Sequence, residues 1–242
     1  MKRFIILMVS AIIFTVSCKD KESRYYVFQG AEMGTIENAV FTTDNGVRLI
    51  VKSAPDGCDI NTKRRVMLYY ILETEGQQNI YYDISVSAIA ETALVEPQPS
   101  ENAEETAEGD PMDIVQGWFS GGYLNVQVMY YVDPEKETPQ TFSANYTCKK
   151  SLSSIAIRRD GQGEGYFSVE NPDECHSFIC IPMKRIWDDF CVFLNEGGDV
   201  IYIPEDRTMP VSLNWRWYAD SDGNLLSDTV SKNTNGLYKA DE

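Results

Sequence analysis

Residues 82–88 have the sequence Tyr-Asp-Ile-Ser-Val-Ser-Ala, and they carry a clear sign of the fold class. In an extended chain one face would carry Tyr82, Ile84, Val86 and Ala88, and the other Asp83, Ser85 and Ser87. Successive side chains of a β-strand point to opposite faces, so this alternation predicts a half-buried strand. We therefore expect a mainly β protein.

The residues before this strand supply its expected neighbours. Residues 66–72 are apolar on both faces, as expected of a central or barrel strand, and Gly34–Val40 is a further short strand candidate. Asn45-Gly46 precedes the alternating run 47–51 and favours a type I′ hairpin, in which both central residues have positive φ. Four or five strands within roughly sixty residues predict a small closed barrel, which we place at residues 31–96.

An acidic segment follows the predicted barrel. Residues 96–113 contain seven acidic residues, three prolines and no lysine or arginine. Such a composition buries too little apolar surface to offset the entropy lost on ordering. Residues 97–112 are therefore expected to form an exposed linker.

The second half of the chain restarts the strand pattern after the Gly121-Gly122 turn. Leu124, Val126, Val128 and Tyr130 alternate with more polar residues, which predicts a half-buried strand. Further strands are expected at residues 152–158, 166–169, 178–181, 200–203 and 211–217. Ile186, Phe190 and Phe193 recur at helical spacing. Residues 113–242 should thus form a second β domain with at most one short helix.

The amino terminus has the pattern of an export signal. Lys2 and Arg3 precede a largely apolar run of thirteen residues, 4–16, which is shorter than the roughly 20 residues a membrane-spanning helix needs. Ser17-Cys18 closes the run and resembles a bacterial lipobox. We expect residues 1–17 to be a signal peptide and Cys18 to carry the lipid, with a plain secretory signal as the alternative.

A lipid on Cys18 would anchor the protein to a membrane that it does not cross. Residues 18–30 would then be a tether leading into the first strand. The expected location is the outer membrane, on its cell-surface or periplasmic face. The charged residues 19–22 after Cys18 are similar to the signal that sends Bacteroidetes lipoproteins to the cell surface.

The charge of the chain excludes one class of partner. The 242 residues carry a formal net charge of −16, and without Lys2 and Arg3 the balance is 19 basic against 37 acidic residues. A phosphate backbone would be repelled, and the densest basic run, residues 63–65, is short. We expect no nucleic-acid partner.

The cysteines and the one histidine form no recognisable catalytic or metal-binding motif. Besides Cys18, the chain contains Cys58, Cys148, Cys175, Cys180 and Cys191. Cys175 and Cys180 could bridge a hairpin, although buried free thiols are the commoner fate of scattered cysteines. Any mechanism that needs histidine must use His176, and its neighbour Cys175 would point to the opposite strand face. The sequence therefore assigns no catalytic residue, metal or cofactor, while a hydrolase built on paired carboxylates remains an alternative.

Aromatic residues are the remaining candidates for a binding site. The second half contains Trp118, Tyr123, Trp215 and Trp217, accompanied by Phe119 and Tyr218. Most such rings fill the core of a β domain, since only alternate strand residues can face outward. Our functional hypothesis is that these four residues provide an aromatic platform for a sugar or a partner protein.

Two segments together resemble a known family. Residues 65–72, Arg-Val-Met-Leu-Tyr-Tyr-Ile-Leu, and the Trp118-x-x-Gly-Gly-Tyr-Leu-Asn125 segment are similar to those of the NigD-like lipoproteins of Bacteroidetes. The resemblance implies an OB-like barrel followed by a β-sandwich, with no catalytic residues to transfer. It also implies an envelope-anchored, non-catalytic protein with a protective, bacteriocin-immunity-like or binding role. The alternative is a glycan- or protein-binding surface component of an uptake system.

Overall fold

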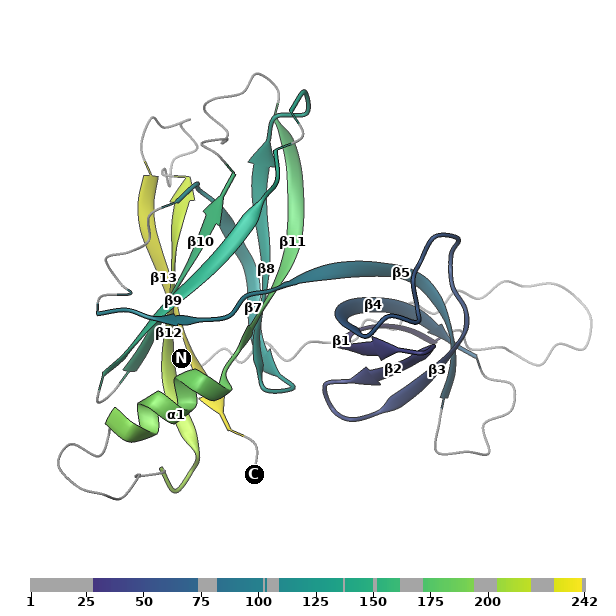
Figure 1. Ribbon diagram of the computed structural model, residues 1–242, viewed down its shortest axis with the longest axis horizontal. Helices are drawn as coiled ribbons and strands as arrows, with labels where there is room; N and C mark the ends of the chain where they lie inside the picture. Colours follow the sequence, from purple (N-terminus) through teal and green to yellow (C-terminus); the bar gives the residue numbers. More distant parts are fainter. Residues whose placement is uncertain are drawn as a thin grey trace, which may run out of the picture. The chain divides into compact units, whose positions relative to one another are not determined.

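The computed structural model describes residues 28–73, 82–101, 103, 109–136, 138–149, 152–161, 172–193, 204–218 and 229–240 (Figure 1). The predicted signal peptide, Cys18 and the strand candidates 166–169 and 200–203 lie outside these residues. The chain divides into two compact units, residues 1–91 and 92–242. The described elements are strands apart from one helix, which confirms the mainly β prediction.

The first unit is a closed five-stranded barrel. Its strands are β1 (Phe28–Glu37), β2 (Val40–Thr43), β3 (Arg48–Ser53), β4 (Arg64–Leu72) and β5 (Tyr82–Leu94). They follow the order β3-β2-β1-β4-β5, and β3 also pairs with β5 in parallel, which closes the barrel. This strand order is that of an OB-type Greek-key barrel, as expected.

The barrel core comes from alternate residues of its strands. Val66, Leu68 and Tyr70 of β4 are buried, as are Ile84 and Val86 of β5. The predicted alternation of residues 82–88 ends at Ser87, where the register between β4 and β5 shifts. Tyr69 pairs with Ala88 and the next residue, Tyr70, pairs with Val86, so Ser87 is an extra residue in β5. An extra residue in one strand reverses the faces beyond it, so Ala88 is exposed.

The turns that join the barrel strands differ from the prediction in their backbone conformation. Asn45-Gly46 does join β2 to β3, but only Gly46 has a positive φ, at 80°. The turn with two positive φ angles is Asn38-Ala39, at 50° and 59°, so β1 ends at Glu37 and Gly34–Val40 is not one strand. The Asn38 and Ala39 amides donate to the carbonyls of Asn61 and Ile60 at 3.0 and 2.8 Å, which holds this turn in place.

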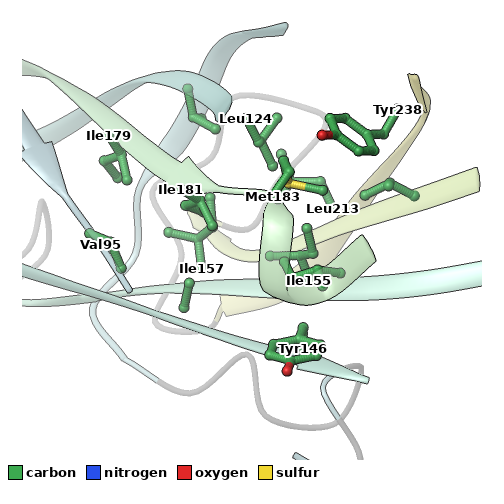
Figure 2. Packing of buried hydrophobic residues seen from close by; sticks show 14 of the residues in the cluster. Val95, Leu124, Tyr146, Ile155, Ile157, Ile179, Ile181, Met183, Leu213 and Tyr238 are labelled. Atoms are coloured by element: carbon green, nitrogen blue, oxygen red, sulfur yellow. The ribbon is translucent and has the colours of Figure 1, made fainter. Parts of the chain in front are cut away.

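The second unit is a sandwich of two sheets. Its elements are β6 (Gln98–Pro99), β7 (Asp113–Ser120), β8 (Tyr123–Val132), β9 (Thr141–Lys149), β10 (Leu152–Asp160), β11 (Asp173–Pro182), α1 (Lys184–Phe193), β12 (Thr208–Tyr218) and β13 (Thr229–Lys239). The end of β5 with β11, β8 and β7 forms one sheet, and the other has the order β13-β12-β10-β9-β6. Both sheets contribute to one core, in which Figure 2 shows Ile179 and Ile181 of β11 with Ile155 and Ile157 of β10. The β-sandwich prediction is thereby confirmed.

Helix α1 covers one part of this sandwich core. Ile186, Trp187, Phe190 and Cys191 are buried, at the helical spacing that the sequence indicated. Asp189 accepts a hydrogen bond from the hydroxyl of Tyr146 on β9, and the Cys148 thiol donates to the Ile186 carbonyl at 3.6 Å. The predicted glycine cap at residues 197–198 lies outside the described residues.

The described part of the expected linker 97–112 is not an exposed tether. Residues 98–99 form β6 and pair with β9, while Ala103 and Met112 are 0% and 1% exposed. The Asp110 amide donates to the Arg159 carbonyl at 2.8 Å. Composition had indicated exposure, but described backbone amides of this segment, those of Ser100, Asp110 and Met112, donate to carbonyls of the sandwich strands, which offsets the ordering entropy.

The cysteines of the described chain are free thiols. Cys175 and Cys180 both lie on β11, so the proposed hairpin bridge between them was wrong: five residues of one extended strand keep their Cα atoms too far apart. Cys58, Cys148 and Cys191 are also unbridged. No helix among the described residues is long and apolar enough to span a bilayer.

Candidate binding groove

The four predicted aromatic residues do not form one platform. Trp215 of β12 is 6% exposed and lies in the sandwich core, and Trp217 packs against the same core. Trp118 and Tyr123 belong to the first sheet, next to the core residues Phe119 and Leu124, so their side chains face away from the core. The Trp118 and Phe178 rings form a T-shaped contact, with centroids 6.5 Å apart.

One of these residues, Trp215, lines a groove in the second unit. The groove lies where edge strand β7 of one sheet approaches β12 and edge strand β13 of the other, and it encloses about 310 Å³. Its lining is mainly apolar and includes Ile114, Val115, Phe119, Leu213, Trp215 and Gly236. We call these residues and the space between them the β7–β13 groove.

A β-bulge shapes the outer wall of the β7–β13 groove. Ile114 pairs with Val128 and Gln116 with Gln127, so Val115 has no direct partner on β8. Bulges on edge strands bend the strand and redirect the extra side chain. Val115 is 51% exposed as a result, and it places an apolar side chain at the mouth of the groove.

The opposite wall depends on a glycine. A Cβ atom at Gly236 of β13 would lie 3.2 Å from Cε2 of Phe119, so the absence of a side chain lets this ring pack against the strand. Phe119 also contacts Tyr238, with centroids 5.4 Å apart, and Tyr238 contacts Trp187 of α1 at 6.2 Å. These three aromatic side chains close the sandwich beside the groove.

Trp215 provides an unused polar group. Its indole Nε1 is buried and has no hydrogen-bond partner among the described residues. A buried indole N–H normally has an acceptor, and leaving such a donor unpaired costs about 1–3 kcal/mol. Trp215 also lines the β7–β13 groove, so this donor belongs to a residue at the groove wall.

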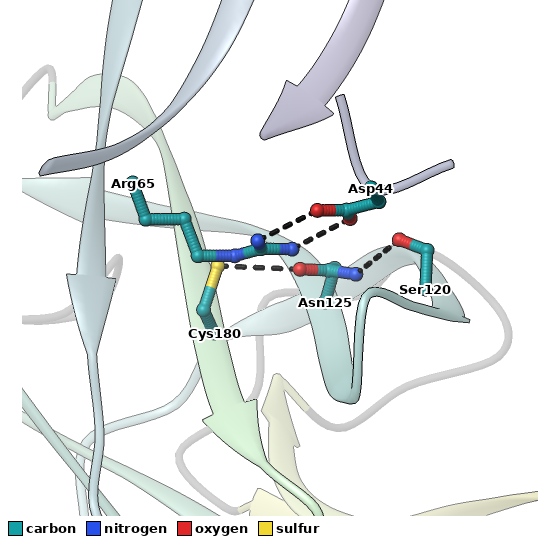
Figure 3. A network of polar contacts seen from close by, with 5 residues as sticks. All are labelled: Asp44, Arg65, Ser120, Asn125 and Cys180. Atoms are coloured by element: carbon teal, nitrogen blue, oxygen red, sulfur yellow. Dashed lines mark hydrogen bonds and ion pairs between the residues drawn. The ribbon is translucent and has the colours of Figure 1, made fainter. Parts of the chain in front are cut away.

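Several other polar side chains are paired within the protein (Figure 3). In the second unit, Asn125 donates to the Ser120 hydroxyl at 2.9 Å and accepts from the Cys180 thiol at 3.3 Å. In the barrel, Arg65 donates twice to Asp44. These contacts stabilise the two units and offer no reactive group.

The described residues contain no convergent catalytic arrangement around the one histidine. His176 is exposed on β11, and its Nε2 lies 3.0 Å from Oε1 of Glu174. Cys175 and Cys180 stand at odd spacing on the same strand, so they point to opposite faces and cannot share a metal ion. No group of three metal-ligating side chains occurs in this part of the chain.

Sequence reasoning missed Val115, Phe119 and Gly236 as groove residues. The consecutive apolar pair Ile114-Val115 interrupts the alternation of the strand, and this irregularity was the available sign of a bulge. Phe119 and Gly236 are more than a hundred residues apart, and no local pattern relates them.

The fold and the groove define a class of protein: an OB-type barrel followed by a two-sheet sandwich with a ligand-sized groove between its sheet edges. No protein-family model and no curated protein matches the sequence. Solved structures do match, among them a NigD-like immunity protein from Bacteroides caccae. That protein is 18% identical over 90% of this chain and 100% of its own, with a TM-score of 0.60.

Two further similar structures come from related bacteria. A candidate lipoprotein from Bacteroides fragilis is 15% identical over 88% of this chain and 99% of its own, with a TM-score of 0.55. A candidate toxin-related protein from Parabacteroides distasonis is 12% identical over 88% and 94% of the two chains, also with a TM-score of 0.55. The expected resemblance to NigD-like lipoproteins is thus confirmed at the level of the fold.

Proposed function

We propose that this protein is a lipid-anchored, non-catalytic binding protein of the outer membrane, with a protective role of the immunity type. Its partner is a polypeptide that places an apolar segment in the β7–β13 groove. The observation that carries the proposal is the pairing of an open apolar groove with a buried indole N–H that has no acceptor among the described residues.

A polypeptide suits both features of the groove. Apolar side chains would cover the exposed Val115 and contact Phe119 and Leu213, removing apolar surface from water. A backbone carbonyl of the same segment would accept from Nε1 of Trp215. Main-chain acceptors occur at every residue of an extended peptide, so this match needs no special side chain.

The anchor and the protective role rest on two other observations. The short apolar leader that ends at Cys18 supports lipidation. The candidate lipoprotein from Bacteroides fragilis, which has the same fold, supports it as well. An immunity protein with this fold supports a protective role, in which capture of a harmful polypeptide at the envelope would shield the cell.

Selection from a random-peptide library tests the groove. The full chain, immobilised in detergent micelles, should enrich peptides with apolar segments. Val115→Glu places a charge at the mouth of the groove and should weaken their binding by about tenfold or more. Val192→Glu is the matched control, because Val192 is a similarly exposed valine, on α1 at 59%.

The control variant should bind the selected peptides as the unmodified chain does. Peptides that bind both variants equally would place the binding surface elsewhere, and failure to enrich any peptide would reject a polypeptide partner. The anchor is tested separately: labelled palmitate should enter the unmodified protein and not Cys18→Ala, which should leave the membrane fraction.

A further inference from the structure

A second cavity lies on the β9–β10 part of the sandwich, and it shares no lining residue with the β7–β13 groove. It encloses about 480 Å³ between the start of β9 and the end of β10. Its lining is mostly polar and includes Asp110, Thr141, Ser143, Arg158, Arg159 and Asp160. Ligand sites of small molecules commonly fall in this range of volumes.

Two of the charged residues at this cavity, Arg159 and Asp110, form hydrogen bonds to other parts of the protein. Arg159 is 1% exposed, and its Nη1 donates to the Tyr131 carbonyl at 3.3 Å and to Gln140 Oε1 at 3.0 Å. Its guanidinium also lies 4.9 Å from the centroid of the Tyr130 ring. Asp110 accepts from the Gly161 amide at 2.7 Å. These contacts hold the end of β10 in place.

The strand register brings the other polar side chains to one face. Ser143 is directly opposite Arg158, and Thr141 is directly opposite Asp160. Arg158 and Asp160 are two residues apart on one strand, so all four side chains share that face. Nε of Arg158 is buried with no hydrogen-bond partner in the described part of the chain.

This face combines donors and acceptors in balance. A guanidinium donates, a carboxylate accepts, and two hydroxyls do both, which is the complement of neighbouring hydroxyl groups on a ligand. The four charged residues at the cavity sum to zero, and the protein as a whole carries −16. An acidic ligand would therefore be repelled at long range, and a neutral one would not.

We propose that this cavity binds a neutral saccharide, with Arg158, Asp160, Thr141 and Ser143 as the groups that contact its hydroxyls. This site is separate from the aromatic platform expected from the sequence, and it does not rest on the function proposed for the β7–β13 groove.

Saturation-transfer NMR on the full chain tests the proposal, in a detergent without a sugar headgroup. The probes are the methyl glycosides of glucose, mannose and galactose, together with sodium galacturonate. At least one neutral glycoside should give a saturable signal. Arg158→Gln and Asp160→Asn should each weaken it by about tenfold or more.

Two further variants separate binding from folding. Ser143→Ala removes one exposed hydroxyl and should weaken the signal with no change in thermal unfolding. Arg48→Gln, an exposed arginine of the barrel, should leave the signal unchanged. The proposal is overturned if no glycoside gives a saturable signal, if binding survives in Arg158→Gln, or if galacturonate binds more tightly than the neutral probes.

Discussion

Arg65 and Asp44 form a two-point ion pair inside the barrel unit. Both guanidinium Nη atoms donate to the carboxylate at 2.7 Å, and the two side chains are only 9% and 8% exposed. The pair joins the start of β4 to the turn between β2 and β3. It therefore connects two elements that are about twenty residues apart in the sequence.

Removal of one partner should be more harmful than removal of both. Asp44→Asn leaves a buried guanidinium without its carboxylate, and we expect a loss of about 3–5 kcal/mol in the free energy of unfolding. The double variant Asp44→Leu/Arg65→Met should be less destabilised, because it buries no charge. Urea unfolding measures both values.

The exposed pair Lys63–Glu37 provides the control for this prediction. Its atoms are 3.6 Å apart and its side chains 70% and 49% exposed, so Glu37→Gln should change stability by about 1 kcal/mol or less. An Asp44→Asn variant as stable as Glu37→Gln would show that burial of the Arg65–Asp44 pair has no energetic effect.

Two barrel glycines should respond differently to alanine. A Cβ atom at Gly34 would lie 2.2 Å from the Thr42 carbonyl oxygen and 2.8 Å from the Phe41 ring. Gly34→Ala must therefore separate β1 from β2, and we expect a loss of at least about 1–3 kcal/mol. Gly46 has open space around it, so Gly46→Ala should cost only the strain of its positive φ, about 1 kcal/mol. Thermal unfolding of both variants checks this order, and equal losses would contradict it.

Tyr146 should make stability depend on pH in the alkaline range. Burial and, next, the hydrogen bond to Asp189 raise the pKa of Tyr146 to about 12 from an ordinary value of 10.0. The unfolded chain loses this proton first, so the stabilisation is complete below pH 10 and is lost as pH rises towards 12. Tyr146→Phe should lose about 1.5–3 kcal/mol at neutral pH.

The difference between Tyr146→Phe and the unmodified protein should therefore shrink between pH 10 and 12. Urea unfolding at several pH values measures it, with Tyr82→Phe as the control because Tyr82 is 41% exposed. A difference that stays constant over this range would mean that Tyr146 ionises equally in the folded and unfolded chains.

Three thiols should react slowly in the folded protein. Burial is the main cause that raises the pKa of Cys148, Cys175 and Cys191 above the usual value. The thiolate is the reactive form, so alkylation at pH 8 should be slower in the folded chain than in urea. Mass spectrometry after timed iodoacetamide labelling gives the rate at each cysteine. Labelling of these three at the unfolded rate would contradict the prediction.

The local patterns identified most elements of the fold. Alternation predicted β5, β8 and β12, and the helical spacing of Ile186 and Phe190 predicted α1. The patterns did not locate the bulge after Val86 or the turn at Asn38-Ala39. Ala39 holds a positive φ while its amide donates to the Ile60 carbonyl, a contact between segments that sequence patterns do not relate.

The candidate site was less predictable than the fold. The aromatic residues were visible in the sequence, but strand parity placed Trp215 and Trp217 towards the core and Trp118 away from it. The β7–β13 groove arises where strands from distant parts of the chain meet, and the saccharide cavity arises where the β9–β10 hairpin meets the segment at Asp110. Composition also indicated an exposed linker at 97–112, where β6 pairs with β9.

Side-chain periodicity alone was enough to predict the fold class, the two β units and the short helix, because it reflects which face of each element is buried. The leader also indicated an anchor at Cys18 and a place in the envelope. Which side chains line the groove or the cavity became visible only in the folded chain. Those neighbours depend on strand order, register and bulges, which are set by contacts between residues far apart along the chain.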